Sequence, residues 1–524
     1  MRLIVQVNAI FGEYKKHLTN LLMNYTFLKK AFLMLCAPLC AAISLMAQIP
    51  AAIPGDYADP SVLRVGNNYF SVATSSEWAP HYPIYQSQNL KDWKLTGYVF
   101  DKTPDWISGS FWAPEYYKIN DTYYIYYTAR RKADGISCIG VATSKYPDRG
   151  FTDKGVIIAY GKEAIDAFLY REKGQLYITF KAYGLDDRPI EILGSKLSAD
   201  GLRLEGEPFS MLKDTERIGL EGQSILKRGK YYYLFYSAGN CCGVDCSYNV
   251  RVARSTNFKG PYELYSNNPV LFQNDKWKCM GHGTLVNDVA GKYYYIHHGY
   301  SKENTVFAGR EGLVSQVQWD SKSGWPAFKS LPDVPPVPTL VTDNFSGSTP
   351  AKNWQWDFRN SAPQFSQANG KLKLSGTTTA DNKTGIVLAL RPYSAILEAS
   401  VKVANSNNEL KGLAYYGDAN AALGIGVKGD SVICWAVRDG KWEKAGGVKV
   451  AQPQNVGVQI KVDANHNCTF YYNADGKGWL AVPLTQTLSA SYLPQWDRSP
   501  RIGLHYKGTS ISSAEFIEFK IDFK

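Results

Sequence analysis

Three acidic residues stand in apolar surroundings, where a charge is costly: Asp59 in "YADPSVL", Asp166 in "AIDAFLY" and Glu221 in "LEGQSIL". Burying an unpaired carboxylate is unfavourable, so each could instead be a strand cap or a partner of an arginine. Paired carboxyls in a dry pocket suit the hydrolysis of a glycosidic bond, because one protonates the leaving oxygen while the other activates water or attacks directly. A third acid can keep the proton on its neighbour by like-charge repulsion.

The elements that would position these acids recur along the chain. A turn with Gly or Asn is followed by alternating aromatic and aliphatic residues, with starts at Tyr69, Tyr123, Leu176, Tyr232 and Tyr294. A period near 55 residues with about four short strands per copy is typical of a β-propeller blade, so the pattern predicts five blades. The alternative is a β-sandwich with accidental similarity between its strands.

The innermost strand of every blade lines the axis of a propeller, so the residues just ahead of each repeat are expected to converge. Counting back ten to twelve residues gives Asp59, Trp112 with Ala113, Asp166, Glu221 and His282. Such a gathering would perturb the pKa values of its members, which is typical of a functional site. The abundance of Trp and Tyr also fits sugar substrates, whose apolar ring faces stack on aromatic side chains.

Six segments of the chain, which include the residues just named, together resemble one known family of enzymes. "DYADPSVLRVGNNYF", "FWAPEYYKINDTYYIYYTA", "IDAFLYREKGQLYITF", "EGQSILKRGKYYYLFYS", "GHGTLV" and "GREGLVSQVQWDSKSGWP" resemble glycoside hydrolase family 43, whose members are five-bladed arabinofuranosidases, xylosidases and arabinanases. The resemblance covers residues 54 to about 330.

The resemblance implies catalytic roles for the three acids. Asp59 matches the general base that activates water, Asp166 the acid that orients its neighbour and raises its pKa, and Glu221 the general acid. The family inverts the anomeric carbon in one displacement. We therefore expect an inverting glycosidase that removes terminal arabinofuranose, or alternatively xylose, from plant cell-wall polysaccharides or their oligosaccharides.

The resemblance also implies binding residues. Trp112 is expected to form a wall of the sugar pocket, and Arg310 and Trp78 are placed with it among the substrate-binding residues. His282 resembles the axial histidine that many members use near a central cation, so a structural calcium ion is expected there, although a lone His is more often a packed residue. No cofactor is required for the chemistry itself.

Rival functions stay open at this point. An endo-arabinanase would share the same propeller, and a fructosidase-like enzyme would share the two-domain plan, but the chain lacks an "NDPNG" start and an "RDP" stretch. A sugar-binding propeller without activity would have no need of three converging acids.

The C-terminal part is predicted to be a second domain. The Pro-rich residues 331–341 read as a linker, and residues 342–524 alternate in the manner of antiparallel strands, which predicts a β-sandwich. This part resembles the concanavalin-like domain of many family 43 enzymes, and we expect it to support the propeller of residues 48–330. Its alternative role is an independent carbohydrate-binding module, with Trp354, Trp356 and Trp435 as candidates for stacking.

Residues 1–47 are predicted to be an export signal with an upstream extension, because a basic start is followed by an apolar run and a small residue. The run is too short to span a bilayer, so we expect a periplasmic or extracellular protein with no membrane span in the mature chain; a lipoprotein anchor is the less favoured alternative. The formal charge of +11 comes partly from this segment, and without a basic stripe it excludes nucleic acid as a partner.

Cysteine usage fits export. Three of the cysteines stand together in "NCCGVDC", which predicts a local disulfide rather than a zinc site, because no second Cys/His pair stands at zinc spacing.

Overall fold

The structure, a computed structural model, describes residues 50–184, 188–451 and 454–524. Strands make up nearly all of its regular structure, and the one α-helix among these residues is the single turn α2 (Thr305–Ala308). The predicted all-β class is confirmed. The predicted export signal at residues 1–47 lies outside the described residues.

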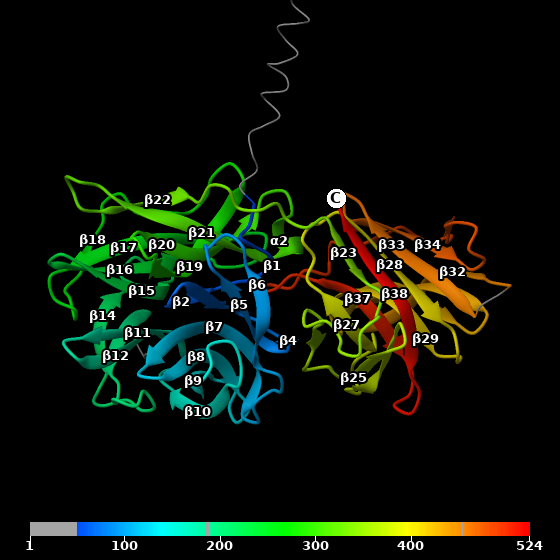
Figure 1. The fold of residues 1–524 in the computed structure, drawn as a ribbon, viewed down its shortest axis with the longest axis horizontal. Helices are drawn as coiled ribbons and strands as arrows, with labels where there is room; N and C mark the ends of the chain where they lie inside the picture. Colours follow the sequence, from blue (N-terminus) through cyan, green and yellow to red (C-terminus); the bar gives the residue numbers. More distant parts are fainter. Residues whose placement is uncertain (1–49, 185–187, 452–453) are drawn as a thin grey trace, which may run out of the picture. The chain divides into compact units, whose positions relative to one another are not determined.

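The first half of the described chain forms the five predicted blades of antiparallel strands, which follow one another in chain order from blue to green (Figure 1). Their innermost strands are β2 (Ser61–Val65), β7 (Ile107–Ile119), β11 (Glu163–Glu172), β15 (Glu221–Arg228) and β19 (Trp277–Asn287). The strands that follow them outward are, blade by blade, β3 (Asn68–Val72), β5 (His81–Ser87) and β6 (Lys94–Phe100); β8 (Thr122–Arg131), β9 (Ser137–Ser144) and β10 (Thr152–Ile158); β12 (Gln175–Tyr183), β13 (Glu191–Lys196) and β14 (Phe209–Lys213); β16 (Tyr231–Ala238), β17 (Asn249–Ser255) and β18 (Glu263–Leu264); β20 (Tyr293–Ser301), β21 (Arg310–Trp319) and β22 (Pro326–Ser330). The short strand β1 (Ile53–Asp56) pairs with β21, so residues that lead into the first blade hydrogen-bond with the last and close the ring.

One backbone feature recurs at the axial end of all five blades. Residues with positive φ stand at Asp59 (52°), Ala113 (40°), Asp166 (59°), Gly222 (59°) and His282 (34°). A left-handed conformation is uncommon for residues other than glycine, and outside turns such residues tend to cluster at functional sites. The repeat seen in the sequence is therefore present in the backbone, at the positions where the candidate site residues stand.

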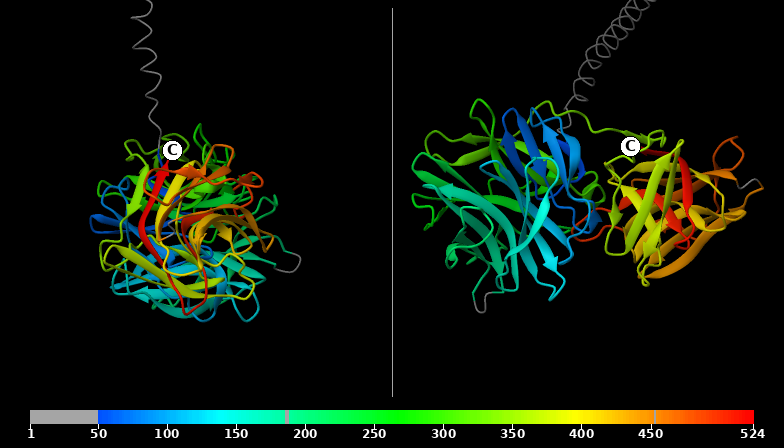
Figure 2. Two further views of the ribbon diagram at one scale, coloured as in Figure 1. Left: turned by 90° about the vertical axis from the view of Figure 1, so that its right-hand side faces the viewer. Right: turned by 60° about the horizontal axis from the view of Figure 1, so that its bottom comes forward.

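The C-terminal part is a sandwich of two antiparallel sheets, coloured yellow to red in Figure 2. The first sheet runs in the order β25 (Ser361–Ala368), β26 (Lys371–Thr378), β38 (Ala514–Phe523), β28 (Leu397–Ala404), β33 (Asn455–Val462), β34 (Asn467–Asn473) and β35 (Leu480–Ala481), with β23 (Leu340–Asp343) beside β38 and β36 (Leu488–Ser489) beside β34. The second runs in the order β27 (Ile386–Leu390), β37 (Arg501–Lys507), β29 (Leu410–Asp418), β30 (Ala421–Lys428), β31 (Ser431–Arg438) and β32 (Lys441–Lys449). Alternate side chains of each sheet fill a common apolar core.

The tryptophans of the sandwich that the sequence singled out serve mainly in packing. Trp354 and Trp435 are buried and Trp356 is half-buried, so the alternative of a stacking platform built from these three is not supported. The predicted domain boundaries stay predictions.

The position of Trp78 shows that one prediction was wrong. This residue is expected from the sequence to contact the substrate, but its side chain is only 1% exposed. It belongs to an apolar cluster with Val387, Ala389 and Trp435 of the sandwich. Its strand β4 (Trp78–Ala79) pairs with β24 (Trp356–Asp357). A side chain sealed in this way has no face left for a sugar, and its role is to join the propeller to the sandwich.

Two disulfides tie down the segment "NCCGVDC". Cys241 is bonded to its neighbour Cys242, and Cys246 is bonded to Cys279 on β19. The predicted local disulfide is therefore confirmed. Cys138, Cys434 and Cys468 are free and buried.

Across the described ranges, no helix is long and apolar enough to cross a membrane.

Candidate active site

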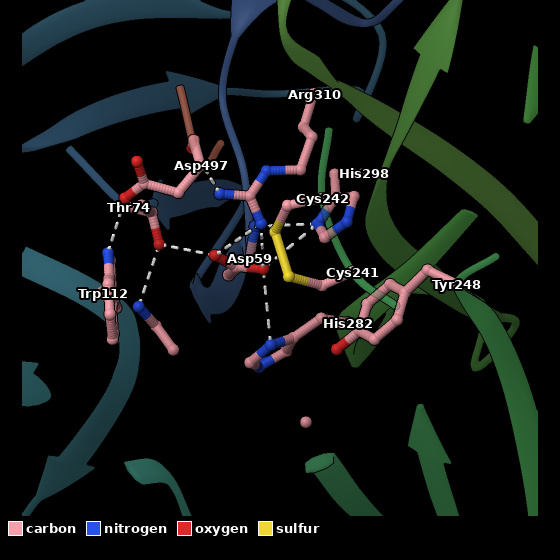
Figure 3. Close-up of polar contacts among 12 residues, drawn as sticks. Asp59, Thr74, Trp112, Cys241, Cys242, Tyr248, His282, His298, Arg310 and Asp497 are labelled. Atoms are coloured by element: carbon pink, nitrogen blue, oxygen red, sulfur yellow. Dashed lines mark hydrogen bonds and ion pairs between the residues drawn. A yellow bond between two sulfur atoms is a disulfide. The ribbon is translucent and has the colours of Figure 1, made fainter. Parts of the chain in front are cut away.

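Asp59 is surrounded by four side chains at the axial end of the first blade (Figure 3). Thr74 Oγ1 donates a hydrogen bond of 2.7 Å to Asp59 Oδ2, and Arg310 Nη1 lies 3.3 Å from both carboxylate oxygens. The Nδ1 atoms of His298 and His282 lie 3.2 and 3.4 Å from Asp59 Oδ1. His298 Nδ1 accepts a hydrogen bond of 3.0 Å from the Asp59 backbone N–H, so the Thr74 hydroxyl and the permanent positive charge of Arg310 hold the carboxylate.

These neighbours decide the charge of Asp59. Burial alone would raise its pKa, but the Arg310 guanidinium, the largest opposing effect, outweighs burial and holds the pKa well below its usual range. Burial lowers the pKa of His298 to about 4, so this ring is neutral near pH 7. Asp59 is therefore ionised at neutral pH, as a base that activates water must be.

Asp166 lies on the third blade and faces the same axis. The backbone N–H of Gly222 donates a hydrogen bond of 2.9 Å to its Oδ2, and His282 Nδ1 lies 3.8 Å from that oxygen. The side chain is buried. His282 therefore lies between Asp59 and Asp166, and the structure brings all three together as predicted.

Glu221 opens the innermost strand of the fourth blade, and both of its carboxylate oxygens have donors. Lys181 Nζ lies 2.8 Å from Oε2, and the Tyr248 hydroxyl donates a hydrogen bond of 2.8 Å to Oε1. Because Gly222 follows Glu221 directly and its N–H binds Asp166, the two carboxyl groups are linked through one backbone segment.

The pKa of Glu221 differs from one expectation. Asp166 was expected to raise the pKa of Glu221. Burial would raise it, but the Lys181 ammonium and the Tyr248 hydroxyl outweigh burial and lower it. For Asp166, burial and the Glu221 charge raise the pKa, against the opposing effects of His282 and Lys181. Lys181 and Tyr248 thus favour the ionised form of Glu221, whereas burial favours the protonated form of Asp166.

His282 is placed by its backbone. Its N–H donates a hydrogen bond of 2.8 Å to Ser237 Oγ, and its ring lies where a Cβ on Gly222 would be 2.8 Å from Cγ. Among the described residues no group of three or more His, Cys, Asp or Glu side chains could hold a metal ion. The contacts of the ring are with Asp59 and Asp166, and its role at a cation stays a prediction.

The sandwich contributes a residue to this site. Asp497 lies between β36 and β37, and its Oδ2 accepts a hydrogen bond of 3.0 Å from Trp112 Nε1 (Figure 3). Its backbone carbonyl accepts a hydrogen bond of 2.9 Å from Arg310 Nη2. Trp112 is half-buried and keeps an exposed part, whereas Arg310 is only 3% exposed. Arg310 therefore holds Asp59 in this structure, and its contact with substrate stays a prediction.

Several residues of the site were not singled out from the sequence: Thr74, Lys181, Tyr248, His298 and Asp497. Lys181 is the one charged residue in β12, which is a usable signal, because a lysine inside an apolar strand needs a partner. Asp497 has no such signal, since it reaches Trp112 across 385 residues of sequence.

Three carboxyl groups at one end of a propeller axis, of which Asp59 is ionised, suit the acid and base chemistry of glycoside hydrolysis. The comparison of sequences agrees: residues 50–326 match the family model "Glycosyl hydrolases family 43", and residues 342–506 match "Beta xylosidase C-terminal Concanavalin A-like domain". The chain belongs to glycosyl hydrolase family 43 and is a glycosidase.

Two individual relatives share less than 30% of their aligned residues with this chain. The chain is 28% identical over 330 residues to the extracellular exo-alpha-(1->5)-L-arabinofuranosidase ArbA of Cellvibrio japonicus, a match that covers 55% of this chain and 90% of the relative. It is 26% identical over 399 residues to a beta-xylosidase of Bacillus subtilis, covering 67% of this chain and 73% of the relative.

Solved structures share the fold over most of the chain. The protein described as Bacteroides ovatus Xyloglucan PUL GH43B superposes with a TM-score of 0.77 at 20% identity, covering 90% of this chain and 99% of that one. The GH43 BlXynB protein of Bacillus licheniformis superposes with a TM-score of 0.76 at 23% identity, with the same coverage. Both parts of the chain thus have counterparts of known fold.

Proposed function

We propose that this protein is an exported, inverting exo-glycosidase that removes terminal α-L-arabinofuranose from plant cell-wall polysaccharides or their oligosaccharides. The observation that carries the proposal is the convergence of an ionised Asp59 and the Glu221 carboxyl, with Asp166 and His282, on one end of the propeller axis, which we call the axial funnel. A single displacement needs a carboxylate to activate water and a carboxylic acid to protonate the leaving oxygen.

Each acid has a distinct role in this mechanism. Asp59 accepts a proton from water as that water attacks the anomeric carbon, and Arg310 and Thr74 hold its carboxylate in place. Glu221 donates a proton to the departing oxygen. Asp166 shares a proton with Glu221, and entry of the leaving oxygen beside Glu221 favours the form in which Glu221 carries it.

Exo action is supported by the way the sandwich reaches the site. Asp497 binds both Trp112 and Arg310, so the wall of the funnel includes residues from both parts of the chain. We infer that these contacts close one side of the funnel, which suits the end of a sugar chain better than its middle. The extracellular exo-arabinofuranosidase relative supports the same choice and, together with the predicted signal, supports export.

A beta-xylosidase is the second candidate, because the sandwich matches a domain named after that activity and a relative is a beta-xylosidase. A panel of 4-nitrophenyl glycosides separates the two. We expect the highest kcat/KM on the α-L-arabinofuranoside; a higher value on the β-D-xyloside would favour the second candidate, and no activity on either would refute the proposal.

Stereochemistry tests the single displacement. Proton NMR of the first-formed sugar should show the anomer opposite to that of the substrate. Retention would require a covalent intermediate and would exclude Asp59 as a base acting on water.

A structural calcium ion near His282 is a separate proposal. If it is correct, EDTA should lower the melting temperature of the wild-type protein and added calcium should restore it, because an ion that binds only the folded state stabilises it. The His282→Ala variant should show neither response. If EDTA does not change the melting temperature of the wild-type protein, no calcium ion is bound there, and His282 serves only as an imidazole between two carboxyls.

A further inference from the structure

The outer face of the first sheet of the sandwich contains a hollow of about 550 Å³ that is separate from the axial funnel. Strands β28, β33 and β38 are neighbours in this sheet (Figure 1). Their alternate residues, such as Val401, Val458 and Ile521, point into the core. The residues between them therefore face outward and line the hollow.

The floor of this hollow is made by small side chains. Ser400 on β28 pairs with Gln459 on β33, and Lys402 pairs with Gly457. Because Ser400 and Gly457 carry little or no side chain, the sheet surface is sunken between longer neighbours. The hollow is therefore built into the register of the two strands.

An exposed tryptophan forms one wall. Trp479 is 43% exposed, and its indole lies over Gly457, where an added Cβ would be 3.1 and 3.4 Å from two ring carbons. Any larger residue at Gly457 would displace the ring. The position of the indole is thus fixed by the strand below it, while one of its surfaces is open to solvent.

One buried polar atom of the described side chains that line the hollow has no hydrogen-bond partner. Gln459 Oε1 is buried and, among the described residues, has no hydrogen-bond partner. Asn473 and Lys520 line the hollow as well. A buried amide oxygen without a partner is unfavourable, and since Gln459 lines the hollow, a rotation of its side chain would offer this oxygen to a ligand.

The charges around the hollow select the kind of ligand. Acidic and basic side chains alternate along its rim, with Glu518 and Asp522 beside Lys520 and Lys402. Mixed charges give no attraction to a polyanion such as nucleic acid. A neutral ligand that offers many hydroxyl groups and apolar C–H faces complements both the amides and the indole.

We propose that this hollow is a second carbohydrate-binding site, in which a sugar ring of a neutral polysaccharide stacks on Trp479 and bonds to Gln459 and its neighbours. The site is distinct from the funnel that contains Asp59 and Glu221. It would hold the enzyme on polymeric substrate while chain ends enter the funnel, and in that respect it rests on the proposed function.

Affinity electrophoresis tests the site with the full chain. Arabinan and arabinoxylan are cast separately in native gels, and the Asp59→Asn variant serves as the background so that the polymers are not degraded. We expect retardation by at least one of these polymers, and a dissociation constant at least about tenfold weaker when Trp479→Ala is added. Leu480→Ala is the matched control, because Leu480 is 56% exposed and adjacent but does not line the hollow.

Each outcome has a defined meaning. Equal retardation with and without Trp479→Ala, or no retardation by either polymer, overturns the proposal. With active enzyme, Trp479→Ala should leave kcat/KM on the 4-nitrophenyl glycoside unchanged and lower the rate on polymer. Polymer binding without any activity on small glycosides would refute the proposed function but leave this site standing.

Discussion

At the scale of single residues, Lys181 is the residue not predicted from the sequence that most affects the chemistry of the site. Its ammonium lies 2.8 Å from Glu221, the residue that we propose as the proton donor, and stabilises the ionised form of that carboxyl. The same charge also opposes protonation of Asp166. Tyr248 lies on the same blade as Glu221, and His282 lies on the fifth blade; both influence the two carboxyls together with Lys181.

Replacing Lys181 with methionine should therefore move the alkaline limb of the pH profile of kcat/KM upward. Loss of the positive charge raises the pKa of Glu221, so the protonated acid persists to higher pH, by about one unit or more. The profile should be measured with an aryl glycoside whose leaving group needs protonation. Lys181→Arg keeps the charge and should keep the limb in place; an unchanged limb in Lys181→Met would mean that this ion pair does not control the acid.

At the scale of structural elements, the innermost strands place the site through residues in left-handed conformation. Gly222 is the critical one, because it has φ of +59° and contacts the ring of His282, and because its N–H binds Asp166. A side chain there would meet both a backbone penalty and a steric clash.

Gly222→Ala should lower kcat/KM by about 100-fold, since small displacements of catalytic groups have effects of this size. It should also lower the free energy of unfolding by about 1–3 kcal/mol. Gly229→Ala is the control, because Gly229 has φ of +60° but open space around its Cα. Activity and urea unfolding are measured for both variants. Equal losses of activity would show that backbone conformation alone, and not the contact with His282, matters.

The elements were the part most accessible from sequence. The repeated pattern of a turn and alternating aromatic residues, which starts at Tyr69 and Tyr123 and recurs three more times, predicted the five blades. Alternation along a strand can be read from neighbouring residues alone. Counting back from each copy found Asp59, Asp166 and Glu221, since equivalent positions in a repeat point in equivalent directions. Lys181 and Tyr248 were missed because their partner, Glu221, stands 40 and 27 residues away and no local pattern relates them.

At the scale of the whole molecule, Trp78 joins the propeller to the sandwich. Its ring packs in a cluster with Val387 and Trp435, and the Arg501 guanidinium lies 4.8 Å from the ring centroid. Its assignment to the sugar pocket was wrong because the sequence does not indicate which tryptophans the second domain will cover.

Trp78→Ala should lower the free energy of unfolding by about 3–5 kcal/mol, the usual cost of removing a large buried aromatic side chain. Urea unfolding followed by fluorescence measures this. Trp479→Ala removes a side chain of the same size that is 43% exposed, and it should change stability far less. Equal destabilisation by the two would contradict a role of Trp78 in joining the two parts; if Trp78→Ala does not fold, Trp78→Phe gives a smaller cavity for the same comparison.

The role of Glu221 as proton donor is the central claim for the molecule as a whole, because the propeller, the neighbouring Asp166 and the ion pair with Lys181 all act through it. A general acid helps only as much as the departing oxygen needs a proton. The decisive measurement is kcat/KM of Glu221→Ala relative to wild type, on a 2,4-dinitrophenyl glycoside and on a natural disaccharide of the same sugar. We expect the disaccharide to lose at least about 100-fold more than the activated substrate, whereas an equal loss on both would contradict the assignment of Glu221 as the acid.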